Sequence, residues 1–354
     1  MQIGCVQLLE FRNYRALTWS PTPHLNVITG PNAQGKTNLL EALGFIVAGR
    51  SFRTSRTAEL ARWGSQGATL SGDLVRGETR RTVRRAVTRL EDGTWQATGE
   101  SAPEWARAIA FGWHDLEIVN GGPSARRNFI DGFAARLYAN HAPTLIRFRQ
   151  ILARRNRLLQ QRPVDAGLAA RLGPWNEQLA TVGMDLLGRR RKAVAALQTE
   201  LARVYAALSG ARSKVEIRYR TALGEAAEPA ALLQALERSQ REEIRRGQTL
   251  AGPHRDDLAI EIDGVDARTF GSRGQQRLTA LALRLAEILP VTDAAGTAPI
   301  LLLDDALSEL DPTVRGHVLN EIRSAEQVFL TTPDAPVVNG AATFHVNAGS
   351  LSPA

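Results

Sequence analysis

An eight-residue segment, GPNAQGKT at residues 30–37, constrains the fold of this 354-residue chain more than any other feature. It fits the pattern G-x-x-x-x-G-K-[ST] and lies between an apolar, β-branched run at 24–29 and helix-spaced apolar residues at 38–48. This context predicts a P-loop, whose backbone N–H groups and helix N-terminus face phosphate oxygens; a plain glycine-rich turn is the alternative. We expect Lys36 to contact the β- and γ-phosphates of ATP and Thr37 to ligate Mg²⁺. The expected nucleotide-binding residues of this segment are Gly30, Asn32, Gln34, Gly35, Lys36, Thr37 and Asn38.

A second segment supplies the carboxylates that such a site needs. Residues 299–303 are apolar and are followed by Asp304 and Asp305, which is typical of a Walker B strand. Carboxylates at the end of a buried strand are costly unless a cation or hydrogen bonds compensate them. We therefore expect Asp304 to hold Mg²⁺ with Thr37, and Asp305 to polarise a water toward the γ-phosphate as a general base. Lys36, Asp304 and Asp305 are the predicted catalytic residues; a helix N-cap and a solvated acid are the alternatives for the two aspartates.

The two segments are more than 260 residues apart, which is more than a compact P-loop domain needs. After residues 120–123 the chain becomes rich in Ala, Leu, Arg and Gln and poor in β-branched residues, and an α/β pattern returns from residue 252. We expect an α/β head formed by residues 1–120 and 251–354, interrupted by a helical arm or lid at 121–250.

Periodicity and turn residues predict the individual elements. Strands are expected at residues 3–9, 16–19, 24–29, 214–219, 258–262, 300–303 and 327–331, with a β-hairpin across 68–97 that turns at 91–93. Helices are expected at residues 38–48, 145–161, 175–207, 229–246, 275–289 and 312–324, with breaks at 162–163 and 173–174. We expect residues 347–354 to be frayed and Cys5 to be buried in the first strand.

Residues 271–277, GSRGQQR, open an apolar helix shortly before the Walker B strand. They resemble the ABC-type signature, in which a serine, a glycine N–H and a helix N-terminus form a second anion site. Such a site cannot reach the P-loop of its own chain. It implies a head-to-tail dimer in which the nucleotide lies between one subunit's P-loop and the other's signature, with a D-loop beside it. The residues concerned are Ser272, Gly274, Gln275 and Asp311.

In this order, the motifs resemble those of the RecF family of bacterial recombinational-repair ATPases, which is related to SMC and ABC heads. Further segments that carry the resemblance are FRNYR at 11–15, GRSFRT at 49–54, GPHRDD at 252–257 and several positions within 111–131. The resemblance runs from about residue 2 to residue 347. The family often has Pro-Glu where this chain has Trp113 and His114. The sequence therefore leaves undecided whether this segment couples to the nucleotide. The alternative is that Trp113 is a core residue.

The resemblance implies an ABC/SMC-type P-loop ATPase head with an inserted helical arm or lid. It implies an ATP-driven homodimer with slow, DNA-stimulated ATP hydrolysis. That dimer would bind double-stranded DNA near single-strand gaps and single-strand/double-strand junctions, and would help to load RecA recombinase with RecO and RecR. In the relatives, the position of Thr331 and Thr332 keeps a γ-phosphate-sensing residue. We expect His254 to be a turn or packing residue, and a contact with the nucleotide is the alternative.

Two other functions share these motifs: the nucleotide-binding subunit of a transporter, and an SMC-like organiser of DNA. The Arg-rich insertion argues against the first, and the shortness of its predicted helical limbs argues against the second.

The charge distribution points to a polyanionic partner. The formal net charge is +8, and 41 of the 44 basic residues are Arg. Residues 141–192 hold 11 basic and 3 acidic residues, and residues 50–89 hold 10 Arg and 3 acidic residues. We expect DNA phosphates on these two basic segments. With one cysteine, no signal-like start and no apolar run long enough to span a bilayer, a cytoplasmic protein without disulfides or structural zinc is expected.

Overall fold

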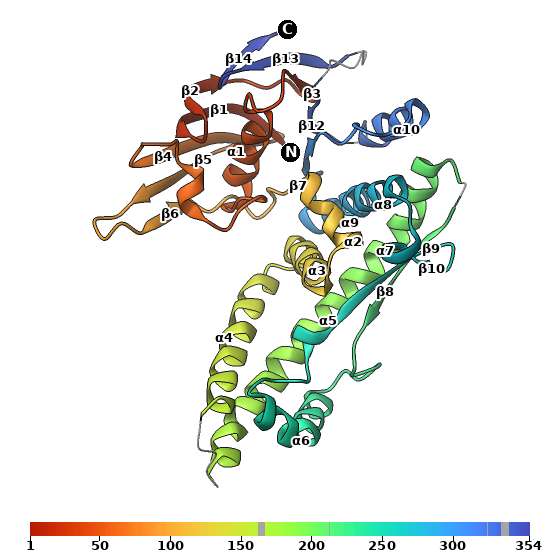
Figure 1. Ribbon diagram of the computed structural model, residues 1–354. Helices are drawn as coiled ribbons and strands as arrows, with labels where there is room; N and C mark the ends of the chain where they lie inside the picture. Colours follow the sequence, from red (N-terminus) through yellow and green to blue (C-terminus); the bar gives the residue numbers. More distant parts are fainter. Residues whose placement is uncertain (162–166, 212, 324, 334–339) are drawn as a thin grey trace. The chain divides into compact units, whose positions relative to one another are not determined.

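The structure is a computed structural model that describes residues 1–161, 167–211, 213–323, 325–333 and 340–354 (Figure 1). The chain forms two compact units. The first unit comprises Met1–Leu116, Arg203–Arg212 and Arg273–Ala354, and the second comprises Glu117–Ala202 and Ser213–Ser272. These bounds differ from the ranges expected from the sequence, because strand Asp257–Ile262 pairs with strand Val215–Arg220 and so belongs to the second unit.

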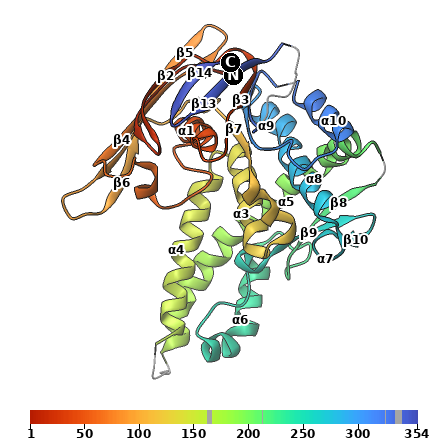
Figure 2. The same ribbon diagram turned by 45° about the horizontal axis from the view of Figure 1, so that its top comes forward.

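A six-stranded sheet of order β14-β13-β3-β12-β11-β7 forms the centre of the first unit. Figure 2 labels β14, β13, β3 and β7 of this sheet. Its strands are parallel apart from β14, which pairs antiparallel with β13. The expected strands at 24–29, 300–303 and 327–331 are confirmed. The prediction of a frayed end is wrong, because residues 350–353 form an edge strand whose backbone groups bond to β13. The strands are β3 (His24–Thr29), β7 (Ala108–Phe111), β11 (Ile300–Asp304), β12 (Gln327–Thr331), β13 (Ala342–Asn347) and β14 (Ser350–Pro353).

A five-stranded antiparallel sheet of order β2-β1-β4-β5-β6 forms the second layer of this unit. The hairpin expected across residues 68–97 is confirmed, and its turn at 91–93 joins β5 to β6. Cys5 lies in β1, as expected, but its side chain is only half-buried. The strands are β1 (Gln2–Phe11), β2 (Tyr14–Trp19), β4 (Gly67–Arg76), β5 (Thr79–Arg89) and β6 (Trp95–Gly99).

The helices of the first unit are α1 (Lys36–Ala48), α8 (Arg273–Leu285), α9 (Ile288–Ala295) and α10 (Pro312–Ile322). The single helix expected at 275–289 is wrong, since α8 ends at Leu285 and α9 starts at Ile288. Pro290 explains the break, because in an unbroken helix its ring would clash with the carbonyl of Ala286. Of the helix expected at 312–324, residue 324 lies outside the described residues.

The second unit contains the helical hairpin. Its helices are α2 (Leu116–Asn120), α3 (Pro123–Leu137), α4 (His141–Leu159), α5 (Leu168–Ser209), α6 (Pro229–Arg246) and α7 (Ala267–Phe270). The last turns of α5, from Arg203, belong to the first unit. A small antiparallel sheet joins β8 (Val215–Arg220), β9 (Asp257–Ile262) and β10 (Val265–Asp266). The strands expected at 214–219 and 258–262 and the helix expected at 229–246 are confirmed.

The break expected at residues 173–174 is wrong, because α5 continues through Pro174. Leu172 before the proline and Leu179 after it are both fully buried, so packing on either side outweighs the loss of one backbone hydrogen bond. The break expected at 162–163 lies outside the described residues.

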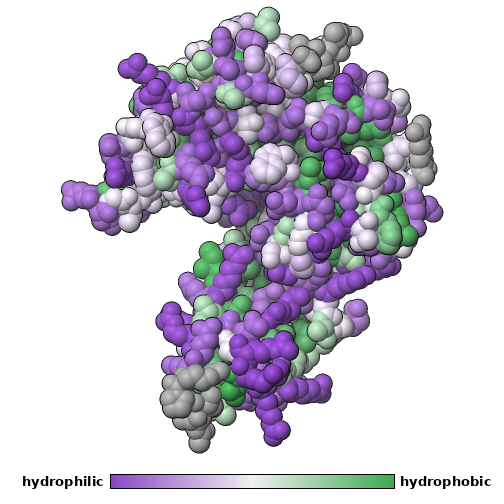
Figure 3. All heavy atoms as spheres, viewed as in Figure 1, coloured by the Kyte–Doolittle hydropathy of each residue, from purple (hydrophilic) through white to green (hydrophobic). Residues whose placement is uncertain are grey.

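Hydrophilic side chains cover most of the face seen in Figure 3, where apolar surface is confined to small patches. Within the described part of the chain, none of the helices combines the length and apolar character that a bilayer span requires.

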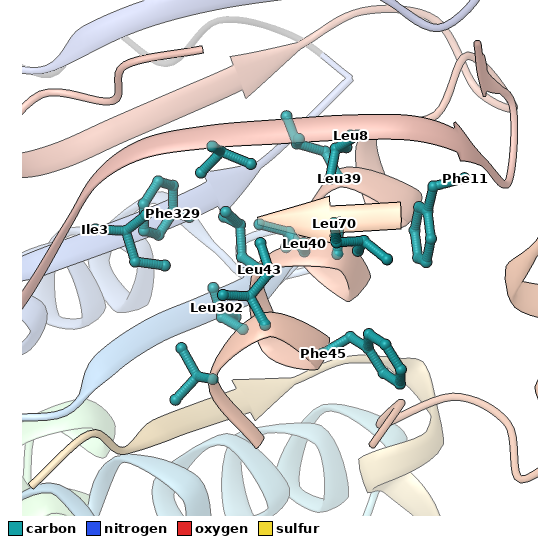
Figure 4. Close-up of a cluster of buried hydrophobic side chains, with 14 of the residues drawn as sticks. Ile3, Leu8, Phe11, Leu39, Leu40, Leu43, Phe45, Leu70, Leu302 and Phe329 are labelled. Carbon is teal, nitrogen blue, oxygen red and sulfur yellow. The ribbon is translucent and has the colours of Figure 1, made fainter. Parts of the chain in front are cut away.

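Helix α1 is held between the two sheets of the first unit (Figure 4). Its residues Leu39, Leu40 and Leu43 are fully buried against strands of both layers. The other labelled side chains of this core are Ile3, Leu8, Phe11, Phe45, Leu70, Leu302 and Phe329. Because the helix is fixed on both sides, the loop that precedes it is fixed as well.

Candidate nucleotide-binding site

The GPNAQGKT loop connects β3 to α1, as its sequence context predicts. Gly30 has φ +136°, and a Cβ there would lie 2.3 Å from the carbonyl oxygen of Val346. Gly35 has φ +118°, and a Cβ there would lie 2.5 Å from the Asn13 side chain. Both positions therefore require glycine, and the loop can follow a path that turns its N–H groups inward.

Lys36 begins α1 and is buried. Its ammonium donates to the carbonyl oxygens of Gly30 (2.6 Å) and Pro31 (3.0 Å), so the side chain folds back along the loop. Burial lowers the pKa of Lys36, and the carboxylates of Asp305 and Asp304 oppose that shift. The arrangement holds the Lys36 ammonium at the mouth of the loop, where an anion would stabilise its charged form.

Asp304, at the end of β11, meets the first turn of α1. The Thr37 hydroxyl lies 2.9 and 2.8 Å from the two carboxylate oxygens of Asp304, and the Thr331 hydroxyl donates to one of them at 2.7 Å. Burial raises the pKa of Asp304 despite these bonds. A hydroxyl and a desolvated carboxylate are the oxygen donors that Mg²⁺ takes beside phosphates and water. These two residues therefore fit the expected metal.

Asp305 has an exposed carboxylate that lines the same cavity. Its backbone is fixed instead: its N–H donates to the Thr331 hydroxyl (2.9 Å), and its carbonyl accepts from Arg277 (2.7 Å). Its φ of +52° is a left-handed conformation that Asp adopts more readily than most residues. Thr331 thus contacts both aspartates. It is one of the two residues at the position where the relatives keep a γ-phosphate-sensing residue.

The cavity around these groups has a volume of about 330 Å³ and lies entirely within the first unit. Three residues outside the predicted set of site residues also line it: Arg53, Trp113 and Arg277. Trp113 is 62% exposed and its ring stacks near His114 at 3.6 Å between centroids, so the alternative of a core residue is wrong. The lining residues are Asn32, Ala33, Gly35, Lys36, Thr37, Asn38, Arg53, Trp113, Arg277, Asp304, Asp305, Thr331 and Pro333.

Arg53 is placed by a buried acid. Its guanidinium donates to Asn38 (2.8 Å) and to Glu41 (3.1 Å), while Arg12 forms two 2.8 Å hydrogen bonds with the same fully buried Glu41. The GRSFRT and FRNYR segments therefore meet at one carboxylate on α1. The sequence shows the two arginine-containing segments, but it does not show that they meet at Glu41, so a role for Arg53 could not be predicted from it.

The middle of the P-loop is braced from two distant turns. Asn13, from the β1–β2 turn, donates to the Gln34 carbonyl at 2.8 Å. From the β13–β14 turn, the N–H of Gly349 donates to the same carbonyl (3.2 Å) and that of Ala348 to the Gln34 side chain (2.8 Å). Gln34 is therefore placed to hold the loop's shape, and it does not line the cavity.

Gly349→Ala should destabilise the protein and weaken nucleotide binding. Gly349 has φ +77°, and a Cβ there would lie 2.4 Å from the Asn13 carbonyl oxygen, so the brace must shift. Gly64→Ala is the control, since Gly64 has φ +83° and nothing within 4 Å of its Cβ. Both variants carry the left-handed strain, and we expect Gly349→Ala to lose at least about 1 kcal/mol more free energy of unfolding in urea. Equal losses of free energy of unfolding in the two variants would show that the contact between Gly349 and Asn13 can shift without cost.

The remaining predicted residues lie away from this cavity. Ser272, Gly274 and Gln275 do not line it, and Ser272 belongs to the second unit. The Asp311 side chain accepts from the N–H groups of Thr313 (3.0 Å) and Val314 (3.1 Å), so it caps α10. His254 also lies in the second unit. Within one chain the P-loop and the Walker B carboxylates meet. Of the segment 271–277, Arg277 lines the same cavity, whereas Ser272, Gly274 and Gln275 do not.

Comparison with known proteins identifies the family. The family model described as RecF/RecN/SMC N terminal domain matches residues 2–348. DNA replication and repair protein RecF of Heliobacterium modesticaldum is 35% identical over 99% of both chains. That of Symbiobacterium thermophilum is 37% identical over 94% of this chain and 92% of its own. This chain belongs to the RecF family.

Solved structures agree with this assignment. A structure described as the recombination mediator protein RecF-ATP in the RecFOR pathway has a TM-score of 0.89 at 27% identity, covering 99% of this chain and 97% of that one. An Smc head bound to the C-winged helix domain of ScpA has a TM-score of 0.57 at 15% identity, covering 99% and 96%. That second likeness concerns the fold alone. The expected fold class, an α/β head of the ABC/SMC type, is confirmed.

Proposed function

We propose that this protein is an ATP-dependent DNA-binding ATPase of recombinational DNA repair. The observation that carries the proposal is the joining of Lys36, Thr37, Asp304 and Asp305 around one cavity, in a chain of the RecF family. Family members of known structure are described as recombination mediators of the RecFOR pathway with ATP or ATPrS. From that membership we infer nucleotide binding and a role beside RecO and RecR.

The residues of the cavity have separate tasks in this proposal. The P-loop N–H groups and Lys36 bind the β- and γ-phosphates, and binding an anion offsets the cost of burying the ammonium. Thr37 and Asp304 would hold Mg²⁺, which when bound neutralises charge that develops on the phosphates. Asp305, exposed to the cavity and fixed through its backbone, orients the attacking water and accepts its proton. Arg53 supplies a further positive charge near the phosphates.

ATP would close a dimer. Ser272, Gly274 and Gln275 do not line the cavity of their own chain, and in the proposed dimer they would contact a second subunit's nucleotide. In a head-to-tail homodimer each γ-phosphate would lie between one P-loop and the other subunit's signature, with Asp311 holding the start of α10 nearby. ATP binds this closed state better than the open one and shifts the equilibrium toward it. Slow hydrolysis then acts as a switch.

Duplex DNA near single-strand gaps is the proposed ligand of the dimer, and help in loading RecA is the proposed outcome. Arginines of β5 support it: Arg81, Arg84 and Arg89 are all exposed, and of these Arg84 pairs with Glu100 at 3.7 Å. Arginine binds phosphates without reading sequence, so affinity should depend on salt and tolerate most sequences. We do not propose an SMC-like organiser, because the RecF relative of Heliobacterium modesticaldum is 35% identical, whereas the Smc head is 15% identical and shares the fold alone.

ATP hydrolysis should be slow and should rise when duplex DNA is added, with the stimulation falling steeply as salt increases. The measurement is the ATPase rate across a salt series, with and without gapped duplex, while light scattering follows the dimer with ATP and with ADP. Because counterion release accompanies each phosphate contact, the apparent DNA affinity should fall roughly 1000-fold or more between 50 and 200 mM salt. An ATPase rate that DNA leaves unchanged at every salt concentration contradicts the DNA-coupled function.

A further inference from the structure

Arg277 lines the nucleotide cavity, and the tasks proposed for the residues of that cavity do not include it. It lies in the second turn of α8, and 11% of its side chain is exposed. It donates to the Asp305 carbonyl and to the Ser308 hydroxyl, each at 2.7 Å, and it pairs with the Glu309 carboxylate at 3.9 Å. One side chain of α8 thus contacts both ends of the turn at residues 305–309, directly after the Walker B strand.

This turn is strained at both ends. Asp305 has φ +52° and Glu309 has φ +60°. Residues other than glycine are strained in this left-handed region, Asp less than Glu, and remain there only where the surrounding structure holds them. Strain of this kind is concentrated at functional sites, where it fixes a side chain in one position. A contact that holds the turn in this conformation therefore also determines where the Asp305 carboxylate lies.

The turn is closed by its own groups, without Arg277. The Asp305 carbonyl also accepts from the Ser308 hydroxyl (3.1 Å) and from the Ser308 N–H (3.3 Å). The Thr331 hydroxyl accepts from the N–H of Asp305 and so attaches the start of the turn to β12. What Arg277 adds is the attachment of the turn to α8. Removing its side chain should release the turn from this helix without opening it.

The contacts of Arg277 are poorly suited to stabilising the fold. Its Nε is buried and has no hydrogen-bond partner in the described part of the chain. A buried donor without a partner lowers stability. The Glu309 side chain is 79% exposed, so the ion pair with it contributes little. A buried arginine with these partners is better explained by a role in the reaction than by a gain in stability.

Arg284, seven residues along the same helix, shows the opposite pattern. Seven residues are close to two full turns, so both arginines lie on one face of α8. Arg284 donates to Asp115 at 3.0 and 2.6 Å and to the fully buried carboxylate of Glu287 at 2.8 Å. Two carboxylates therefore compensate its charge, as is expected of an arginine that stabilises the fold. The helix thus provides a structural arginine with which Arg277 can be compared.

We propose that Arg277 is a positioning residue for ATP hydrolysis, which holds the strained turn against α8 so that the Asp305 carboxylate stays in the nucleotide cavity. The inference rests on the proposed role of Asp305 as general base. A general base has to lie within hydrogen-bond reach of the water from which it takes a proton. A displacement of about 1 Å can cost roughly 100-fold in rate, so a released turn would slow hydrolysis while the P-loop still binds ATP.

Three variants of the full-length protein test this role, each with methionine in place of one arginine. They are Arg277→Met, Arg284→Met as the structural comparison, and Arg323→Met as the control. Arg323 is exposed at the end of α10 and does not line the cavity. Methionine keeps an unbranched side chain but removes the charge and the hydrogen-bond donors. Rates across a range of ATP concentrations give kcat and KM, and urea unfolding gives the stability.

Arg277→Met should lower kcat by roughly 100-fold, leave KM within about threefold of the wild type, and change the free energy of unfolding little. Arg277→Lys keeps a charged donor and should recover part of kcat. Arg284→Met should lose much of the stability, because it leaves Glu287 buried without its partner. Arg323→Met should match the wild type in all three quantities. A loss of stability in Arg277→Met as large as that in Arg284→Met would make Arg277 a structural residue and overturn the assignment.

A double variant separates positioning from direct contact with the phosphates. If Arg277 acts only through Asp305, Arg277→Met combined with Asp305→Asn should hydrolyse ATP no more slowly than Asp305→Asn alone. Rate losses that multiply, or an unchanged kcat in Arg277→Met, overturn the assignment while the proposed function stands. If the wild type does not hydrolyse ATP, or Asp305→Asn hydrolyses it as fast as the wild type, the proposed function itself fails at that step.

Discussion

Lys36→Ala should weaken ATP binding by roughly 10- to 150-fold and should abolish ATP-driven dimerisation. The ammonium is buried and donates only to loop carbonyls within the described chain, so its main gain comes from the phosphates. A hydrogen bond to a charged group contributes about 1.5–3 kcal/mol, which corresponds to that loss of affinity. ATP binding is measured by isothermal titration calorimetry. Lys214→Ala removes an exposed lysine of the second unit and should bind ATP like the wild type.

The same variant tests whether the site is shared between subunits. Lys36→Ala and Ser272→Arg should each be inactive alone, the first through its P-loop and the second through its signature. In a head-to-tail heterodimer of the two, one of the two sites is built entirely from wild-type residues. An equal mixture should therefore recover roughly one quarter of the wild-type ATPase rate. No recovery on mixing, with both variants folded, would contradict the composite site.

The local parts of the site were predictable from the sequence because short-range patterns determine them. The β3 strand, the P-loop and α1 follow one another within 25 residues, and glycine, lysine and threonine are each required by the backbone or by phosphate chemistry. The same holds for the apolar strand that ends at Asp304. What these patterns leave open is which distant segments support the loop.

The features that sequence analysis missed depend on distant contacts. The last strand, β14, exists only because β13 pairs with it, and its turn then reaches Gln34. Pro174 ordinarily ends a helix, but buried leucines on either side keep α5 intact. In each case tertiary packing overrides a local preference.

Asp304→Asn should slow ATP hydrolysis and at the same time increase the stability of the metal-free protein. Without the charged ligand, Mg²⁺-dependent ATP hydrolysis should fall by at least about 100-fold, since a metal ion contributes several kcal/mol to the transition state. The metal-free protein should nevertheless become more stable at neutral pH. Burial raises the pKa of Asp304, so the folded state binds a proton more tightly than the unfolded state does. Its contribution to stability is present at low pH and is lost as the pH rises through the folded-state pKa.

Urea unfolding in EDTA at several pH values measures this effect. The stability gained by Asp304→Asn should be largest at neutral pH and should vanish as the pH falls below the ordinary range of aspartate, where the wild-type carboxyl is also neutral. Asp305→Asn is the matched control, because it also removes a carboxylate from the cavity but one that is exposed. It should slow hydrolysis without stabilising the protein. Equal stability of Asp304→Asn and the wild type at neutral pH would mean that the Thr37 and Thr331 hydroxyls already compensate the buried charge, and that Mg²⁺ is not needed to do so.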